Sequence, residues 1–231
     1  MKHLLSILFL LSFSGLFCQT TITELKVKSE EKYGPDDILI NGISYIPLHP
    51  SANGNPFFGE NTFITSYINL KGRDFKNVLL KYDIEQQVVI LKVNESYGGK
   101  KINLSNNYIK DFVINNKHFV NINEFDIEDE YIKFLELVYM GDFIFGNYYS
   151  KNFLAVYSNK YPYGKYTKTK VSKYLFLNGK KYFIKNKGDI LSLFPEHKHD
   201  IKKFIKKNKI KFRKATNDEF FKLMQYCDEL N

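Results

Sequence analysis

The chain has 231 residues, of which 44% are hydrophobic, 26% charged and 16% aromatic, and its formal net charge is +9. This composition is typical of a globular protein and excludes collagen-like and low-complexity disordered chains. Only one apolar run approaches membrane-spanning length, and because it lies at the extreme N-terminus, a multi-pass membrane protein is excluded. A chain of this size buries enough surface to fold without a metal ion or a disulfide.

The N-terminus predicts a signal peptide over residues 1–18. A short basic start precedes an apolar run over residues 4–17, which is long enough for a signal peptide and too short for a membrane span. We expect cleavage after Cys18, and the predicted locations are the periplasm, the extracellular space or the periphery of the outer membrane. The alternatives are a buried N-terminal helix and a lipoprotein, although a lipoprotein would have a small residue where Phe17 stands.

Between residues 38 and 185 the pattern predicts short strands joined by tight turns. Asn41-Gly42 and Asn178-Gly179 are the strongest two-residue hairpin signals. The strands predicted beside and between these turns cover residues 38–40, 43–45, 62–70, 75–82, 87–93, 108–114, 118–122, 131–139, 142–149, 152–157, 173–177 and 180–185. Their spacing of about ten residues favours an antiparallel β-sandwich or a partly open barrel.

From about residue 189 the hydrophobic period becomes helical. Asp189 is expected to cap a first turn, Pro195 is typical of a helix start, and Thr216 with Glu219 fits a capping box. Apolar residues at helical spacing follow at Ile201, Phe204, Ile205, Phe220, Leu223, Met224, Cys227 and Leu230. The sequence therefore predicts an α+β, mostly β protein in which two C-terminal helices (about 189–230) pack on the sheet. Residues 19–231 are predicted to be one domain.

Two segments resemble an uncharacterised family of secreted Bacteroidota proteins. The first is Asn77-Val78-Leu79-Leu80-Lys81-Tyr82-Asp83 followed by a strand. The second is Leu191-Ser192-Leu193-Phe194-Pro195 together with the basic helix over residues 201–209. The resemblance covers about residues 53–230 and rests on structural motifs. It implies export and a β-rich body with a C-terminal helix pair, and it implies no activity or catalytic residue.

The sequence indicates no assembled catalytic set or metal site. It has no His-Glu-x-x-His, Cys-x-x-Cys, EF-hand loop or Gly-x-Ser-x-Gly motif. His197 and His199 would point about 200° apart on a helix, which favours an exposed first turn over a pair of metal ligands. Gly98-Gly99 is interpreted as a hairpin turn rather than a phosphate-binding loop. We expect no catalytic residue, no metal ion and no cofactor.

Two further candidates are interpreted as structural. Five carboxylates between residues 124 and 130 are dense enough for calcium, but their spacing matches no known loop and favours a solvated turn. They are Glu124, Asp126, Glu128, Asp129 and Glu130. Cys227 would be the only cysteine after cleavage, so no intramolecular disulfide is expected, and its helical register predicts a buried thiol.

The basic excess is concentrated in the C-terminal region. Residues 198–214 contain nine basic side chains and one acidic side chain, a net charge of +8. We call Lys202, Lys203, Lys206 and Lys207 the lysine stripe, because they would lie opposite the apolar face of their helix. The stripe predicts contact with an anionic envelope surface or an envelope protein, and a solvated face is the alternative. Nucleic acid is not a predicted partner, because 32 of the 34 basic residues are lysine.

A second candidate surface is the tyrosine loop, residues 157–170. It interleaves tyrosines with lysines around Pro162 and Gly164, and its candidate contact residues are Tyr161, Tyr163 and Tyr166. Tyrosine supplies rigid contact area with a polar tip, which suits a protein or glycan partner. A mobile loop without a partner is the alternative.

These features favour an exported, non-enzymatic binding protein of the cell envelope, with no transmembrane span in the mature chain. One alternative is a secreted hydrolase whose site is built from scattered strand residues. Another is an envelope assembly component that pairs through exposed strand edges.

Overall fold

The computed structural model describes residues 36–127 and 129–230. The predicted signal peptide, residues 1–18, lies outside the described residues. None of the described helices is long and apolar enough to cross a membrane.

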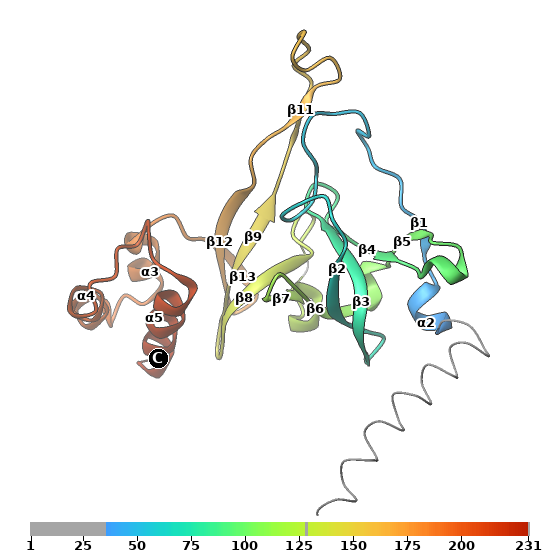
Figure 1. The fold of residues 1–231 in the computed structure, drawn as a ribbon. Coiled ribbons are helices and arrows are strands. Elements are labelled where there is room, and N and C mark those ends of the chain that lie inside the picture. The colour runs from blue at the N-terminus through green and yellow to red at the C-terminus, as the bar shows by residue number, and fades with distance from the viewer. Residues whose placement is uncertain (1–35, 128, 231) are drawn as a thin grey trace, which may run out of the picture.

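The protein is mostly β, as predicted, and most of its strands form one open antiparallel sheet (Figure 1). The sheet order is β1-β5-β4-β3-β2-β6-β7-β8-β9-β12-β13. Its strands are β1 (Ile43–Ser44), β2 (Ile64–Leu70), β3 (Arg73–Asp83), β4 (Val88–Lys92), β5 (Lys101–Asn103), β6 (Ile109–Ile114), β7 (Lys117–Asn121), β8 (Phe134–Met140), β9 (Ile144–Ser150), β12 (Lys170–Leu177) and β13 (Lys180–Phe183). A separate ribbon of β10 (Phe153–Leu154) and β11 (Lys165–Tyr166) projects beyond the sheet in Figure 1.

Three tight turns bring both of their central residues to positive φ. The predicted Asn178-Gly179 turn is confirmed: its φ angles are 51° and 69°, and it joins the paired strands β12 and β13. Lys71-Gly72 joins β2 to β3 and Asn115-Asn116 joins β6 to β7 with similar angles. Such turns match the right-handed twist of the strands that they connect.

The hairpin predicted at Asn41-Gly42 is wrong. Asp36 caps a helical turn, α2 (Asp37–Ile40), by accepting a hydrogen bond from the Ile38 N–H at 3.0 Å. β1 then pairs with β5 rather than with residues 38–40. Gly42 does not form a turn but lets the chain lie close to β5. A Cβ at this position would lie 2.4 Å from Cγ2 of Ile102. The apolar side chains of α2 pack on the core, which a flat hairpin strand would not allow.

The sheet rolls around a first core. Gln87, just before β4, donates from Nε2 to the carbonyl of Tyr149 on β9 at 3.0 Å, although these strands are far apart in sheet order. Tyr82, Phe112, Phe119 and Phe134 contact one another inside the roll. Two short 3-10 helices, η1 (Glu95–Tyr97) and η2 (Asn106–Tyr108), connect strands at its rim.

The first core lies on one face of β8 and β9. On the same face, three C-terminal helices pack against the sheet and enclose a second core. Their bounds are α3 (Lys187–Leu193), α4 (Lys198–Lys207) and α5 (Asn217–Glu229). The structure thus has three C-terminal helices where two were predicted. α3 and α4 are separate because the helical structure is interrupted between Leu193 and Lys198, and Pro195 lies in this break rather than at the predicted helix start. The N-cap of α3 is Asn186, not Asp189, and Asp189 completes the capping box from the third helical position. The predicted box of Thr216 and Glu219 is confirmed at α5.

The opposite face of the sheet has a third, smaller core. It lies under the segment that contains η3 (Ile122–Phe125) and the connection to β8. Leu135 and Ile144 point into this core, whereas Phe134 and Phe145 on the same strands point to the other face. β8 and β9 are therefore buried on both faces, which explains why apolar side chains such as Phe134 and Leu135 follow one another along the strand.

A buried carboxylate lies between the first and second cores. Glu136 stands on β8 between Phe134 of the first core and Val138 of the second. Its Oε1 accepts from Lys117 at 2.5 Å and from Asn217 of α5 at 2.8 Å. Its Oε2 accepts hydrogen bonds at 2.8 and 2.6 Å from the side chains of Asn147 and Tyr149, respectively. Glu136 therefore links the rolled sheet to the helical layer.

We expect Glu136→Gln to destabilise the fold by about 1–3 kcal/mol, because a neutral amide weakens the hydrogen bonds of the four donors and leaves the partly exposed ammonium of Lys117 without its anionic partner. Burial opposes ionisation of Glu136, but the hydrogen bonds from Lys117, Tyr149 and Asn147 outweigh it and lower the pKa of the carboxyl. A lowered pKa in the folded state stabilises the protein above the ordinary glutamate pKa, and this contribution is lost as the pH falls through the folded value. Chemical denaturation between pH 7 and pH 3 measures both effects.

Glu95→Gln is the matched control. Glu95 accepts a salt bridge from Lys92 at 2.8 Å, but three quarters of its side chain is exposed. The free energy of unfolding should hardly change in this variant. Equal stabilities of the two variants at pH 7 would contradict a structural role for Glu136.

Candidate functional site

The segment that lines the candidate site is the 45–63 loop, which lies across the ends of β3 and β4. The Phe58 N–H donates to the carbonyl of Tyr82 at 2.8 Å, and the Ile84 N–H donates to the carbonyl of Pro56 at 3.0 Å. Nζ of Lys151, which follows β9, donates to the carbonyls of Asn55 and Phe57 at 3.0 and 2.8 Å. These contacts hold the loop against the sheet without regular strand pairing.

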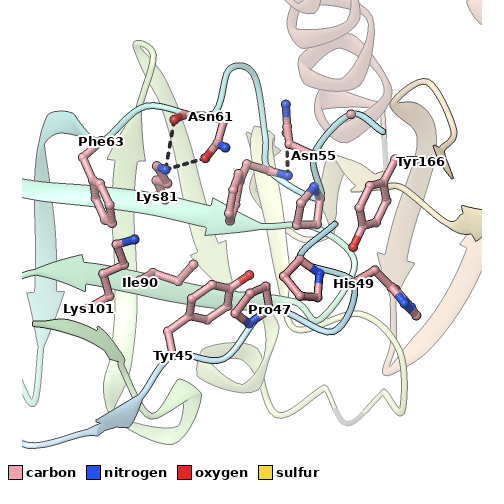
Figure 2. Close-up of a pocket in the computed structure, with 14 residues that line it drawn as sticks. Tyr45, Pro47, His49, Asn55, Asn61, Phe63, Lys81, Ile90, Lys101 and Tyr166 are labelled. Carbon is pink, nitrogen blue, oxygen red and sulfur yellow. Dashed lines mark hydrogen bonds between the residues drawn. The ribbon is translucent and has the colours of Figure 1, made fainter. Parts of the chain in front are cut away.

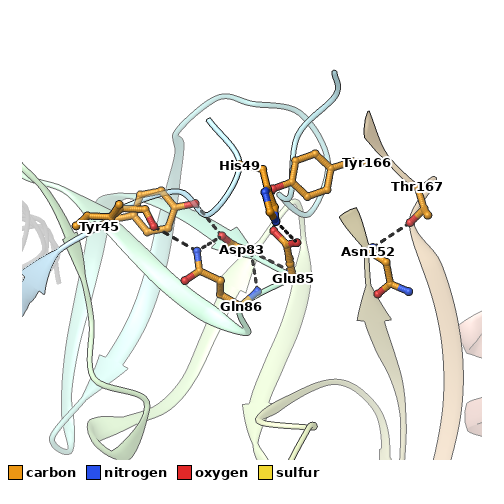
Figure 3. A network of polar contacts seen from close by, with 9 residues as sticks. Tyr45, His49, Asp83, Glu85, Gln86, Asn152, Tyr166 and Thr167 are labelled. Atoms are coloured by element: carbon orange, nitrogen blue, oxygen red, sulfur yellow. Dashed lines mark hydrogen bonds and ion pairs between the residues drawn. The ribbon is translucent and has the colours of Figure 1, made fainter. Parts of the chain in front are cut away.

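The buried carboxylate of Asp83, at the end of β3, fixes the loop from below (Figure 3). Its Oδ2 accepts from the Tyr45 hydroxyl at 2.7 Å and from Nε2 of Gln86 at 3.1 Å. Its Oδ1 accepts from the N–H groups of Glu85 and Gln86, both at 2.9 Å. Burial and the bond to Asp83 raise the pKa of Tyr45 far above its ordinary value, so this hydroxyl stays a donor.

The base of the β10–β11 ribbon closes the other side of the loop. Tyr166 donates from its hydroxyl to Oε2 of Glu85 at 2.8 Å, and its N–H donates to the carbonyl of Asn53 at 2.9 Å. His49 stacks on Phe153 with ring centroids 3.6 Å apart, and its Nε2 lies 3.9 Å from Oε1 of Glu85. The ribbon, the loop and the β3–β4 turn therefore form one connected unit (Figure 3).

These segments enclose a pocket of about 210 Å³ (Figure 2). Three of the six prolines of the chain line it, so much of its wall has restricted backbone freedom. The lining residues are Tyr45, Pro47, His49, Pro50, Gly54, Asn55, Pro56, Phe57, Asn61, Phe63, Lys81, Ile90, Lys101 and Tyr166. None of the side chains that line it in the described part of the chain is an aspartate or a glutamate.

Two lysines give one end of the pocket a positive charge. Nζ of half-buried Lys81 donates to Oδ1 and the carbonyl of Asn61 at 2.6 and 3.1 Å. The same ammonium lies 4.6 and 4.4 Å from the ring centroids of Phe57 and Phe63. Desolvation, and secondarily the charge of Lys101, lower the pKa of Lys81. Among residues 36–127 and 129–230, no carboxylate lies within ion-pair distance of either lysine.

The three predicted tyrosines do not form one surface. Tyr166 lines the pocket, Tyr161 is half-buried with Nζ of Lys165 4.4 Å from its ring centroid, and Tyr163 is 64% exposed. The exposed apolar side chains of the projecting ribbon and its connecting loop are Leu154, Val156, Tyr157 and Tyr163, which we call the ribbon tip. Gly164 is required below the tip, because a Cβ there would lie 2.5 Å from the Phe153 ring.

The lysine stripe lies on the outer side of α4. Lys202, Lys203, Lys206 and Lys207 are all exposed, while Ile201 and Ile205 of the same helix are buried in the second core. None of these lysines has a carboxylate within ion-pair distance in the part of the chain that the structure describes. The predicted orientation of the helix is therefore confirmed, whereas a role for the stripe stays a prediction.

Other predicted features have structural roles. Cys227 is buried, and burial raises the pKa of its thiol to about 12, which makes thiolate chemistry unfavourable. Asp129 forms an ion pair with Lys181 and accepts the N–H groups of Tyr131 and Ile132, so it organises the approach to β8. The described residues contain no group of three metal-ligating side chains, and Glu128 of the acidic segment lies outside them.

Comparison of the chain with models of protein families, with curated proteins and with solved structures finds no match. The resemblance to a family of secreted Bacteroidota proteins therefore stays a prediction.

We expect Tyr45→Phe to loosen the 45–63 loop, because Oδ2 of Asp83 loses a buried hydrogen bond. The expected cost is about 1–2 kcal/mol. Hydrogen exchange followed by mass spectrometry should show faster exchange over residues 45–58 and unchanged exchange over β12. Tyr67→Phe is the matched control, because Tyr67 donates to Asp74 at the same 2.7 Å but in an exposed position. Unchanged exchange in the 45–63 loop of Tyr45→Phe would contradict the anchoring role of Asp83.

Proposed function

We propose that this protein is exported and acts by binding, and that the lysine stripe attaches it to an anionic surface of the cell envelope. The apolar start of the sequence supports export. The supporting structural observation is that all four lysines of the stripe are exposed on one side of α4, with no carboxylate within ion-pair distance in the described chain.

An anionic bilayer fits the stripe because lysine is a flexible point charge that needs no fixed partner geometry. Each lysine near such a surface contributes roughly 1 kcal/mol, or about fivefold in affinity. Attachment would be electrostatic alone, since the apolar face of α4 is buried within the protein. Binding should therefore weaken as salt shortens the Debye length.

Binding is favoured over the two alternative functions by further observations. The pocket is lined by lysines and, among the described residues, by no carboxylate, whereas a hydrolase of the alternative kind would need converging acids. The two edges of the described sheet, β1 and β13, are two and four residues long, which leaves little backbone for strand pairing.

Sedimentation with lipid vesicles tests the attachment. We expect the protein to bind phosphatidylglycerol vesicles at low salt and to leave them as salt rises. Replacing all four stripe lysines by glutamine should weaken binding by a factor of roughly several hundred and flatten the salt dependence. The control variant carries Lys76, Lys100, Lys110 and Lys180 as glutamine, which removes the same charge from exposed positions elsewhere. Equal losses of vesicle binding in the two variants would mean that net charge alone accounts for binding, which would contradict the proposal.

A second contact surface is favoured by the ribbon tip. Tyr157 and Tyr163 are 67% and 64% exposed, on a projection that is hydrogen-bonded to the 45–63 loop at its base. Exposed tyrosines on a held scaffold bury large area at low entropic cost when a protein partner binds.

Photo-crosslinking in the native cell tests the tip. A benzophenone amino acid at Tyr163 should give one discrete adduct with an envelope protein. The same residue at Tyr131 is the control, because that tyrosine is 68% exposed but lies next to β8, away from the ribbon. Identical adducts from the two positions, or none from Tyr163, would contradict a contact role of the tip.

A further inference from the structure

We propose that the pocket under the 45–63 loop binds a small carboxylic acid with an apolar body, whose carboxylate is held between Lys81 and Lys101. This site is separate from the lysine stripe and does not depend on it. Lys81 lies on β3 and Lys101 on β5, the two strands that flank β4, and both side chains line the pocket.

The positive charge of Lys81 and Lys101 is not balanced by a nearby anion among the described residues. A partly desolvated ammonium is unfavourable unless an anion or several oxygens compensate for the water it has lost. Among residues 36–127 and 129–230, the hydrogen-bond acceptors of Lys81 are the two neutral oxygens of Asn61, and the neighbouring charge is another cation, Lys101. Two acids beside the pocket are already engaged: Asp83 accepts four hydrogen bonds, and Glu85 accepts the hydroxyl of Tyr166.

Lys151, which holds the 45–63 loop against the sheet, has more hydrogen-bond acceptors in this loop than Lys81 has. Its Nζ donates to three oxygens of the 45–63 loop, the carbonyl and Oδ1 of Asn55 and the carbonyl of Phe57, at 2.8–3.2 Å. All three of its protons thus have acceptors. Lys81 donates to a single residue and faces a cavity with a second cation, which is the arrangement expected of a ligand-binding ammonium.

The residues that line the pocket determine which apolar group the bound carboxylic acid can have. Beyond the lysines the pocket is bordered by Phe63, Ile90 and the ring of Tyr45, and its far end by prolines (Figure 2). At about 210 Å³ the pocket is smaller than the roughly 300–1,000 Å³ of typical drug-sized sites. A compact acid with a flat or branched apolar body therefore fits better than a sugar chain or a peptide.

A carboxylate is favoured over a phosphate by the donor set. Each of the two lysine ammonium groups can donate to one of the two oxygens of a carboxylate. The arginine forks that often clamp a phosphate are absent from the lining in the described structure.

Titration of the purified protein with three probes of one shape tests the proposal. We expect benzoate to bind in the millimolar range or tighter, and benzamide and benzylamine to bind at least tenfold more weakly, since they lack the negative charge. Benzamide binding as tight as benzoate binding would overturn the electrostatic basis. Phenyl phosphate binding tenfold tighter than benzoate would overturn the choice of a carboxylate.

Three variants locate the site. Lys81→Met keeps the aliphatic stem and should weaken benzoate binding at least tenfold, and Lys101→Met, at an exposed position, should weaken it about threefold to fivefold. Lys76→Met is the matched control, because Lys76 lies on β3 but outside the pocket, and it should bind benzoate like the wild type. If Lys81→Met does not fold, Lys101→Met decides alone. Benzoate binding unchanged in Lys101→Met would overturn the site.

Discussion

The buried carboxylate of Asp83 is the interaction on which the architecture of the pocket depends. It joins the end of β3, the turn into β4 and, through Tyr45, the 45–63 loop. Each of its oxygens accepts two hydrogen bonds, so its desolvation is compensated by local donors alone. The loop can therefore lie over the sheet in one position and expose Lys81 to a cavity instead of covering it.

Most strands could be predicted from the sequence because local patterns determine them. Alternation along β2 and the Asn178-Gly179 turn depend on neighbouring residues, and the structure confirms both. Asn41-Gly42 does not form its predicted turn because the preceding residues form α2, whose apolar side chains pack against the first core, and because Gly42 allows close contact with β5. The cap predicted at Asp189 is wrong because Asn186, three residues earlier, is an equally good cap that completes the same box.

The pocket could not be predicted, because its residues come from segments that only the rolled sheet brings together. Tyr45, Lys81, Lys101 and Tyr166 lie far apart in the sequence, and each is unremarkable in its local context. A local signal did exist, namely the prolines at 47, 50 and 56 next to Phe57, which indicate a stiff loop against an apolar surface. These prolines indicate one side of the pocket, but they do not indicate that a cavity lies between the loop and the sheet. The ribbon tyrosines illustrate the same limit, since Tyr166 faces the pocket and Tyr163 faces solvent.

The lysine stripe and the pair Lys81 and Lys101 have different proposed roles, surface attachment and ligand binding. The surroundings of the ammonium groups, not the residue type, account for the difference. On α4 the ammonium groups are surrounded by water, so each keeps its hydration and attracts a surface only through a screened, long-range field. Lys81 has lost part of that hydration to Phe57 and Phe63, and its lowered pKa reflects the loss. An anion bound next to Lys81 compensates for the hydration that the ammonium has lost. Salt screens this short-range interaction only weakly. One chemical group can thus supply diffuse attachment on the helix and selective ligand binding beneath the loop.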